Sequence, residues 1–114
     1  MIVDKGDRSD NWLDSSGSAM FIYGIQRGIE LGLLDKKEYA KVVKKGYKGI
    51  RETAKINEKG LVDIHGAGDG ITVKKDYETY INVKKVLNAK EAVAGFLWAT
   101  AIIEKPELEK LKKK

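Results

Sequence analysis

The chain has 114 residues, a length typical of one domain, and it has no cysteine, which excludes disulfides and thiolate metal sites. Its composition of 42% hydrophobic and 34% charged residues is typical of a folded domain and argues against disorder. No stretch has the length and apolar character of a membrane span or a secretory signal. We therefore expect a single domain over residues 1–114, located in the cytoplasm and without a membrane partner.

Residues 10–34 predict a capped, apolar helix, which begins among polar residues that often cap helices. Three glycines lie one turn apart along one side of it: Gly24, Gly28 and Gly32. Each glycine costs about 1 kcal/mol relative to alanine in a helix, so their alignment predicts close approach of a neighbouring backbone. A membrane dimer motif has the same spacing, but Arg27 and Glu30 interrupt this apolar run. We favour an inner helix of a soluble helical array.

A second helix is predicted to begin directly afterwards. Asp35 and Glu38 have the spacing of a capping box. A narrow apolar stripe follows at helical spacing, with lysines on the opposite face: Tyr39, Val43, Tyr47, Ile50 and Ala54. A stripe this narrow predicts an outer helix that rests on one neighbour and faces water elsewhere, and residues 57–60 are expected to end it.

This second helix is strongly basic. Residues 36–51 contain seven lysine or arginine residues and one acidic residue, Glu38. A basic patch can bind nucleic acid. However, few aromatic or arginine residues are interleaved here, so we favour a solvated lysine face and do not expect nucleic acid as a partner.

The pattern changes after the second helix. Residues 61–64 and 71–73 are short β-prone runs on either side of a glycine-rich loop, and long loops are often functional. Residues 88–91 carry another capping signature, and the segment that follows is apolar almost all round, which predicts a core helix. Pro106 is expected to stop this helix, leaving residues 105–114 as a charged tail.

The predicted order is inner helix, outer helix, crossover loop and inner helix, and antiparallel helix pairs of this kind are what an α/α toroid is built from. We therefore predict an all-α fold, a partial α/α toroid with a short β-like excursion. The predicted helices are too few to close a ring, and the last one would expose much apolar surface alone.

Three segments carry a resemblance to known enzymes. The run N-W-L-D-S-S-G-S-A-M-F-I-Y-G-I-Q-R-G-I-E-L-G-L-L-D at residues 11–35 resembles N-Y-L-E-[TS]-S-G-S-A-M-F followed by a helix ending G-x-x-x-G-x-L. Residues 76–80 resemble a D-G-S-Y-E-Y-Y element, and residues 88–97 resemble N-D-x-K-G-V-G-x-F-L. These patterns belong to the unsaturated rhamnogalacturonyl hydrolases, glycoside hydrolase family 105, related to the family 88 unsaturated glucuronyl hydrolases.

The resemblance implies that this chain is the C-terminal segment of an (α/α)6 barrel. Such enzymes release an unsaturated uronic acid from pectin-derived oligosaccharides: an aspartate protonates the C4=C5 enol ether and activates water. That differs from the two-carboxylate scheme of ordinary glycosidases. The catalytic aspartate and the W-x-R-G-x-x-W segment precede the matched part of the family, and no match to them occurs here. We therefore predict no catalytic residue in this chain and no activity for the chain alone.

Three residues are candidates for substrate binding. Ser16 lies in the matched serine-rich segment, although it could instead cap the helix. His65, the only histidine, lies on the glycine-rich loop in a position similar to a histidine of the family 88 relatives, and a structural role is the alternative. Tyr80 could stack on a sugar or pack in the core. His65 and Asp69 are too few to predict a metal site, and we expect neither metal nor cofactor.

The expected partner is an unsaturated uronic-acid oligosaccharide. The alternative function is a non-catalytic, self-associating helical module, whose copies would meet along the glycine stripe or around Trp98. A homo-oligomer or a complementary barrel segment would in either case cover the exposed helices.

Overall fold

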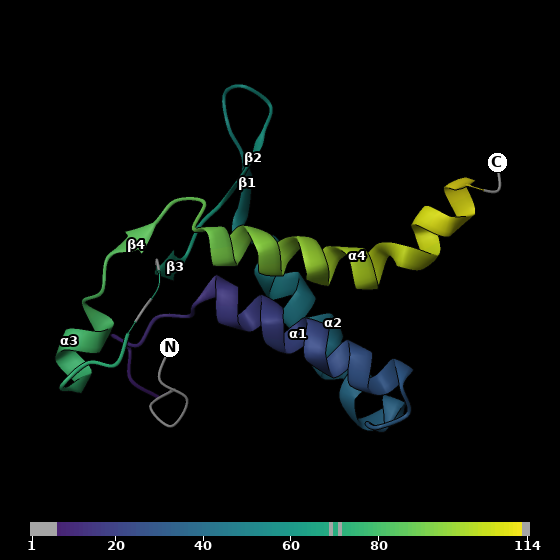
Figure 1. Cartoon of the computed structure of the whole chain (residues 1–114), viewed down its shortest axis with the longest axis horizontal. Coiled ribbons are helices and arrows are strands. Elements are labelled where there is room, and N and C mark those ends of the chain that lie inside the picture. The colour runs from purple at the N-terminus through teal and green to yellow at the C-terminus, as the bar shows by residue number, and fades with distance from the viewer. Residues whose placement is uncertain (1–6, 69, 71, 113–114) are drawn as a thin grey trace.

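The computed structural model describes residues 7–68, 70 and 72–112. Two long helices, α1 (Ser15–Glu30) and α2 (Lys36–Arg51), come first, and α4 (Lys90–Lys112) comes last. A short helix and four short strands lie between them: β1 (Ala54–Ile56), β2 (Val62–Ile64), β3 (Ala67–Gly68), α3 (Tyr77–Ile81) and β4 (Lys85–Val86). The described chain is thus mainly helical with a short β-like excursion, as predicted (Figure 1).

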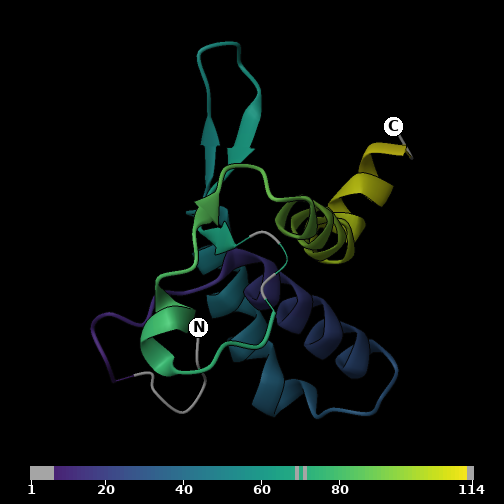
Figure 2. The ribbon, with the colours of Figure 1, turned by 60° about the vertical axis from the view of Figure 1, so that its left-hand side comes forward.

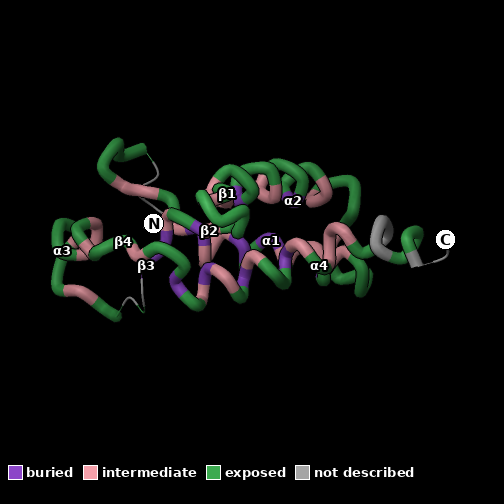
Figure 3. Tube along the Cα trace, turned by 90° about the horizontal axis from the view of Figure 1, so that it is seen from above, coloured by how far each residue is buried: buried purple, intermediate pink, exposed green. Residues whose placement is uncertain are grey.

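Helix α1 is the central element, because it packs against both α2 and α4 (Figure 2). The buried side chains that join the three helices are Ala19 and Ile22 from α1, Val43 and Ile50 from α2, and Ala99 from α4. Tyr47 also links α2 to α4, since its hydroxyl donates a 2.7 Å hydrogen bond to Glu104. Figure 3 shows the buried residues concentrated where these helices meet.

The three aligned glycines do not serve the purpose that the sequence suggested. A Cβ at Gly24 would meet nothing within 4 Å. One at Gly28 would lie 2.8 Å from the side chain of Leu34, in the turn that follows the same helix. Gly32 lies beyond the end of α1 with φ of +74°, so it permits a left-handed turn. The prediction of a backbone packed along this stripe is therefore wrong.

Close packing between helices instead depends on glycines elsewhere. A Cβ at Gly95 of α4 would lie 3.2 Å from the Ala19 Cβ and 3.4 Å from the Ser16 carbonyl oxygen. A Cβ at Gly46 of α2 would lie 2.8 Å from the Ile22 side chain. Each neighbour of α1 therefore approaches it through a single glycine.

The predicted cap of α2 is confirmed, but its predicted end is not. The Asp35 side chain accepts a 2.9 Å hydrogen bond from the Lys37 backbone N–H. The helix ends at Arg51, and Ala54 begins β1, which pairs antiparallel with β2. Residues 57–60 form the turn of this hairpin, where Asn57 accepts backbone N–H groups with its side chain.

Two other sequence predictions need correction. Thr72 and Val73 lie outside any strand, and Ile71 lies outside the described residues. Helix α4 does not stop at Pro106 but continues to Lys112, through the charged tail. Proline removes one backbone N–H from the helix, and the ribbon bends in this last part of α4 in Figure 1.

The chain is open and flat. Its principal extents are 52 × 40 × 22 Å and its radius of gyration is 15.8 Å, against about 13 Å for a compact domain of this length. Its accessible surface is 8575 Å², whereas a compact monomer of this mass has about 6,200 Å². Phe21 and Trp98 are each 62% exposed. The helices thus form an arc with an uncovered apolar surface, not a closed globule.

Two glycine substitutions test this account of packing. We expect Gly24→Ala to stabilise the chain by about 0.5–1 kcal/mol, because alanine favours the helix and its Cβ meets open space. We expect Gly46→Ala to destabilise the chain by about 1 kcal/mol, because the cost of overpacking the new Cβ against Ile22 exceeds the gain in helix propensity. Urea unfolding of both variants measures the difference, and equal stabilisation by the two alanines would contradict the close approach at Gly46.

Candidate functional site

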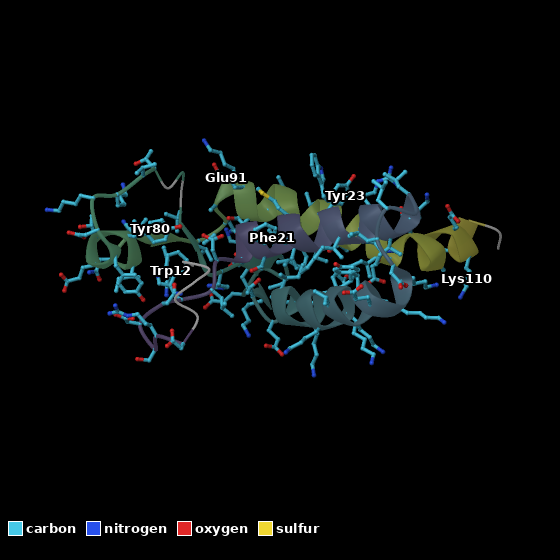
Figure 4. The ribbon with its side chains drawn as sticks, turned by 90° about the horizontal axis from the view of Figure 1, so that it is seen from below. Trp12, Phe21, Tyr23, Tyr80, Glu91 and Lys110 are labelled. Atoms are coloured by element: carbon cyan, nitrogen blue, oxygen red, sulfur yellow. The ribbon has the colours of Figure 1, made fainter. Side chains whose placement is uncertain are left out.

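A cleft of about 430 Å³ opens at the N-terminal end of α1. Helix α1 contributes Ser16, Met20 and Phe21, the segment after β3 contributes Gly70, α3 contributes Tyr80 and α4 contributes Glu91. Figure 4 shows Phe21, Tyr80 and Glu91 on three of the elements that surround it. Segments distant in the sequence therefore meet at one hollow, which Phe21, Tyr80, Ser16 and Glu91 line together.

Asp14 organises this end of the molecule. Its side chain caps α1 by accepting the backbone N–H groups of Ser16 at 2.8 Å and Gly17 at 3.0 Å. The same carboxylate oxygen also accepts a hydrogen bond from the Ser16 hydroxyl, and the other oxygen accepts one from the Gly68 N–H of β3 at 3.5 Å. One carboxylate thus joins the start of α1 to the strand that borders the cleft.

The surroundings of Asp14 keep it ionised. Partial burial by itself raises the pKa of this carboxyl group, but the hydrogen bonds from Ser16, Gly17 and Gly68 outweigh burial, so the pKa is lowered from its ordinary value of 3.8. At neutral pH Asp14 is therefore an anion, and its oxygens are occupied by backbone N–H groups of α1 and β3. It is suited to holding the cleft together and unsuited to donating a proton.

The long crossing segment between α2 and α4 is anchored at several points. The Ser15 N–H donates to the Gly66 carbonyl at 2.9 Å. The Trp12 indole N–H donates to the Ile81 carbonyl at 2.9 Å, which fixes α3 near the start of α1. Asn88, in a left-handed conformation with φ of 55°, accepts the Ile64 N–H at 2.7 Å. These hydrogen bonds fix the positions of α3 and of the start of α4, and so of Tyr80 and Glu91 in the wall of the cleft.

The structure brings two of the three predicted binding residues together. Ser16 and Tyr80 both line the cleft, whereas His65 is exposed on the segment between β2 and β3 and does not line it. The cap of α1 is Asp14, and the Ser16 hydroxyl donates to that cap. That Ser16, His65 or Tyr80 contacts a substrate stays a prediction.

Sequence reasoning did not identify Glu91 as a cleft residue. One oxygen of its carboxylate is buried without a hydrogen-bond partner among the described residues. Glu91 lies in the first turn of α4, where the helix dipole favours a negative charge. Its only sequence signal was its place in the capping signature at residues 88–91, and such a signature does not reveal that α3 folds back beside it.

No group of three or more histidine, cysteine, aspartate or glutamate residues that could hold a metal ion lies within the described residues, and Asp69 is outside this part of the chain. No helix of the described part is long and apolar enough to cross a membrane.

Comparison with known proteins identifies the family. The model of Glycosyl Hydrolase Family 88 matches residues 1–106. The chain belongs to glycosyl hydrolase family 88. This membership confirms the resemblance found in the sequence.

Two solved structures share the fold of this family 88 chain. A family 105 glycoside hydrolase of C. acetobutylicum ATCC 824 matches with a TM-score of 0.82 and 26% identity over 91% of this chain. A possible family 105 member from Klebsiella pneumoniae subsp. pneumoniae MGH 78578 matches with a TM-score of 0.65 and 21% identity over 87%. The matches cover 31% and 25% of those chains, so the chain spans under a third of their length.

These matches confirm the predicted fold class, a partial α/α toroid with a short β-like excursion. That the matched third is the C-terminal one stays a prediction.

The capping role of Asp14 predicts a specific dependence of stability on pH. Because its pKa is lowered on folding, the stabilisation is present above the unfolded pKa near 3.8 and is lost as pH falls through the lower, folded value. We expect wild type to be more stable than Asp14→Asn by about 0.5–1 kcal/mol at pH 7, since asparagine keeps the cap but loses the charge.

Urea unfolding across acid and neutral pH measures this difference, which should shrink below pH 3.8. Asp14→Ala is the control, because relative to Asp14→Asn it removes the uncharged cap and should cost about 1 kcal/mol at every pH. A difference between wild type and Asp14→Asn that stays constant on acidification would show that the ionised carboxylate is not what holds this end.

Proposed function

We propose that this chain is the substrate-binding part of an unsaturated uronyl hydrolase that acts on pectin-derived oligosaccharides. The observation that carries the proposal is the cleft itself. In this family 88 chain, Ser16, Tyr80 and Glu91 line one cleft of about 430 Å³, which is large enough for one or two sugar rings. The location of the chain in the cytoplasm is part of this proposal.

Each side chain of the cleft offers a contact that suits a sugar. The Tyr80 ring presents a flat face on which a pyranose can stack. The buried Glu91 oxygen that lacks a hydrogen-bond partner can accept a hydrogen bond from a sugar hydroxyl once a small movement of the side chain exposes it. Such a bond is favourable, because a buried carboxylate oxygen without a donor carries an uncompensated desolvation cost. The Ser16 hydroxyl donates its hydrogen bond to Asp14, so the lone pairs of its oxygen can still accept a hydrogen bond from a sugar hydroxyl.

The same residues do not supply the chemistry. Hydration of the C4=C5 double bond requires an acid that holds a proton at working pH. Asp14 is unsuitable, because its pKa is lowered and both its oxygens accept hydrogen bonds from α1 and β3. We therefore propose that the catalytic acid comes from residues outside this sequence, and that this chain alone binds without turnover.

An unsaturated digalacturonate with this chain as the sole protein provides the test. We expect calorimetric binding and no loss of the double-bond ultraviolet absorbance. Tyr80→Ala should weaken the binding about fivefold by removing the stacking face. Tyr77→Ala is the matched control, since Tyr77 lies on the same short helix but its hydroxyl bonds to Asp10 outside the cleft.

Failure to bind would contradict the proposed function. Loss of absorbance would contradict the proposed division between binding and catalysis, and the effect of Glu91→Gln on that loss would show whether Glu91 is the acid.

A second candidate function is self-association, and the uncovered face of α1 and α4 favours it. Tyr23 and Trp98 contact each other across these helices with ring centroids 5.4 Å apart, yet Trp98 remains 62% exposed. Leu97 beside it is 61% exposed. A second copy, or a complementary segment of the toroid, would bury this apolar surface.

Light scattering tests whether copies of this chain meet on that face. We expect a mass above the 12.7 kDa of one chain, and a monomer for Trp98→Glu because a charge would then be buried. Leu61→Glu is the control, since Leu61 is also 62% exposed but lies on the β1–β2 hairpin. A wild-type chain that is monomeric at high concentration would rule out self-association and leave the complementary segment.

A further inference from the structure

The basic residues of α2, for which the sequence alone favours a solvated face, form a regular line. Five of them follow one another at spacings of four, three, four and three residues: Lys37, Lys41, Lys44, Lys48 and Arg51. This spacing places them on one side of an α-helix, over about 21 Å at 1.5 Å per residue. All five are exposed. We call this line the α2 basic stripe.

The stripe is not neutralised by the rest of the described chain. The ion pairs found there join Arg8 to Asp10 and Arg27 to Glu30, and neither involves α2. Like charges three or four residues apart destabilise a helix, so the stripe opposes folding unless an anion lies along it. Its buried side is already occupied, because Val43 and Ile50 pack on α1.

The stripe also borders a hollow that leads toward the cleft. A groove of about 790 Å³ is lined by four residues of the stripe and by three of their neighbours: Lys41, Lys44, Lys48 and Arg51, with Lys45, Tyr47 and Glu52. A second groove of about 570 Å³ shares Lys45 and Glu52 with it and shares Asp14 and Ser18 with the cleft. A linear ligand held in the cleft could therefore continue over the surface toward the stripe.

The chemistry of the stripe distinguishes between polyanions. Nucleic acid recognition combines phosphate contacts with aromatic or arginine side chains for the bases. The stripe has one arginine, Arg51, and its guanidinium already lies over the half-buried ring of Tyr47, 5.8 Å from the ring centroid, while the Tyr47 hydroxyl is bonded to Glu104. An anionic membrane would need an apolar helix face to insert, and that face of α2 is packed on α1. A chain of uronic acids needs neither, because it presents one carboxylate per sugar.

We propose that the α2 basic stripe binds an acidic polysaccharide, a chain of uronate units, outside the cleft. The proposal rests on the proposed function, since the cleft would take the end of the same class of polymer. The stripe would raise the local concentration of polymer ends near the cleft and align the chain along α2 by charge alone.

The probe is a saturated oligogalacturonate, which has no double bond and so tests the stripe independently of turnover. We expect the variant with Lys41, Lys44 and Lys48 all changed to Gln to bind it about tenfold more weakly than wild type, with a shallower dependence of affinity on salt. The matched control changes Lys59, Lys75 and Lys84 to Gln, which removes the same charge from exposed sites outside α2. It should bind within about twofold of wild type, because long-range charge effects are screened.

A variant with arginine at the same three stripe positions should keep the affinity, which excludes a folding defect as the cause of the loss. Equal binding by the wild type and the glutamine stripe variant would overturn the proposal, as would equal binding of the methyl-esterified, uncharged oligomer. Tighter binding of a single-stranded oligonucleotide of equal charge would also overturn it and make the surface a nucleic-acid interface. Failure here leaves binding of the unsaturated disaccharide to the cleft unaffected, so the two proposals fail separately.

Discussion

The Asp14 carboxylate is the constraint on which the arrangement of this chain depends. A helix that begins in the interior of a fold has free backbone N–H groups, and α1 satisfies two of them with Asp14. Because the same carboxylate also reaches the Gly68 N–H, the start of the central helix and the crossing segment are fastened at one point. The cleft exists because Tyr80 and Glu91 are brought to this point by the segment so fastened.

The position of α1 between α2 and α4 explains why the molecule has little interior. A helix flanked on two sides buries small residues such as Ala19 and Ala99 but leaves its remaining side uncovered. Among the described residues, no large side chain is fully buried. Burial of apolar area supplies most of the free energy of folding, so a flat arc of three helices gains less of it than a closed ring.

Local features of this fold could be predicted from the sequence, and contacts between distant segments could not. The Asp35 cap and the core helix after residue 88 follow from short-range rules, and the family resemblance supplied the toroid. The glycine stripe misled because glycine spacing does not reveal what lies opposite: Gly24 faces open space, whereas Gly95 meets Ala19. Glu91 was missed for the same reason, since its place beside Tyr80 depends on the path of 24 residues from Ile64 to Asn88.

The charges of the chain are divided between two tasks. The anionic groups near the cleft, Asp14 and Glu91, lie at helix N-termini, where backbone N–H groups and the helix dipole stabilise them. An incoming uronate would be repelled by these carboxylates if they were the nearest charges. In the proposed binding mode, the exposed lysines of α2 offset that repulsion from outside, because residues 36–51, with seven basic residues and one acidic residue, attract the polymer before short-range contacts form. Sugar hydroxyls would then meet the carboxylates, while the carboxylates of the ligand stay near α2.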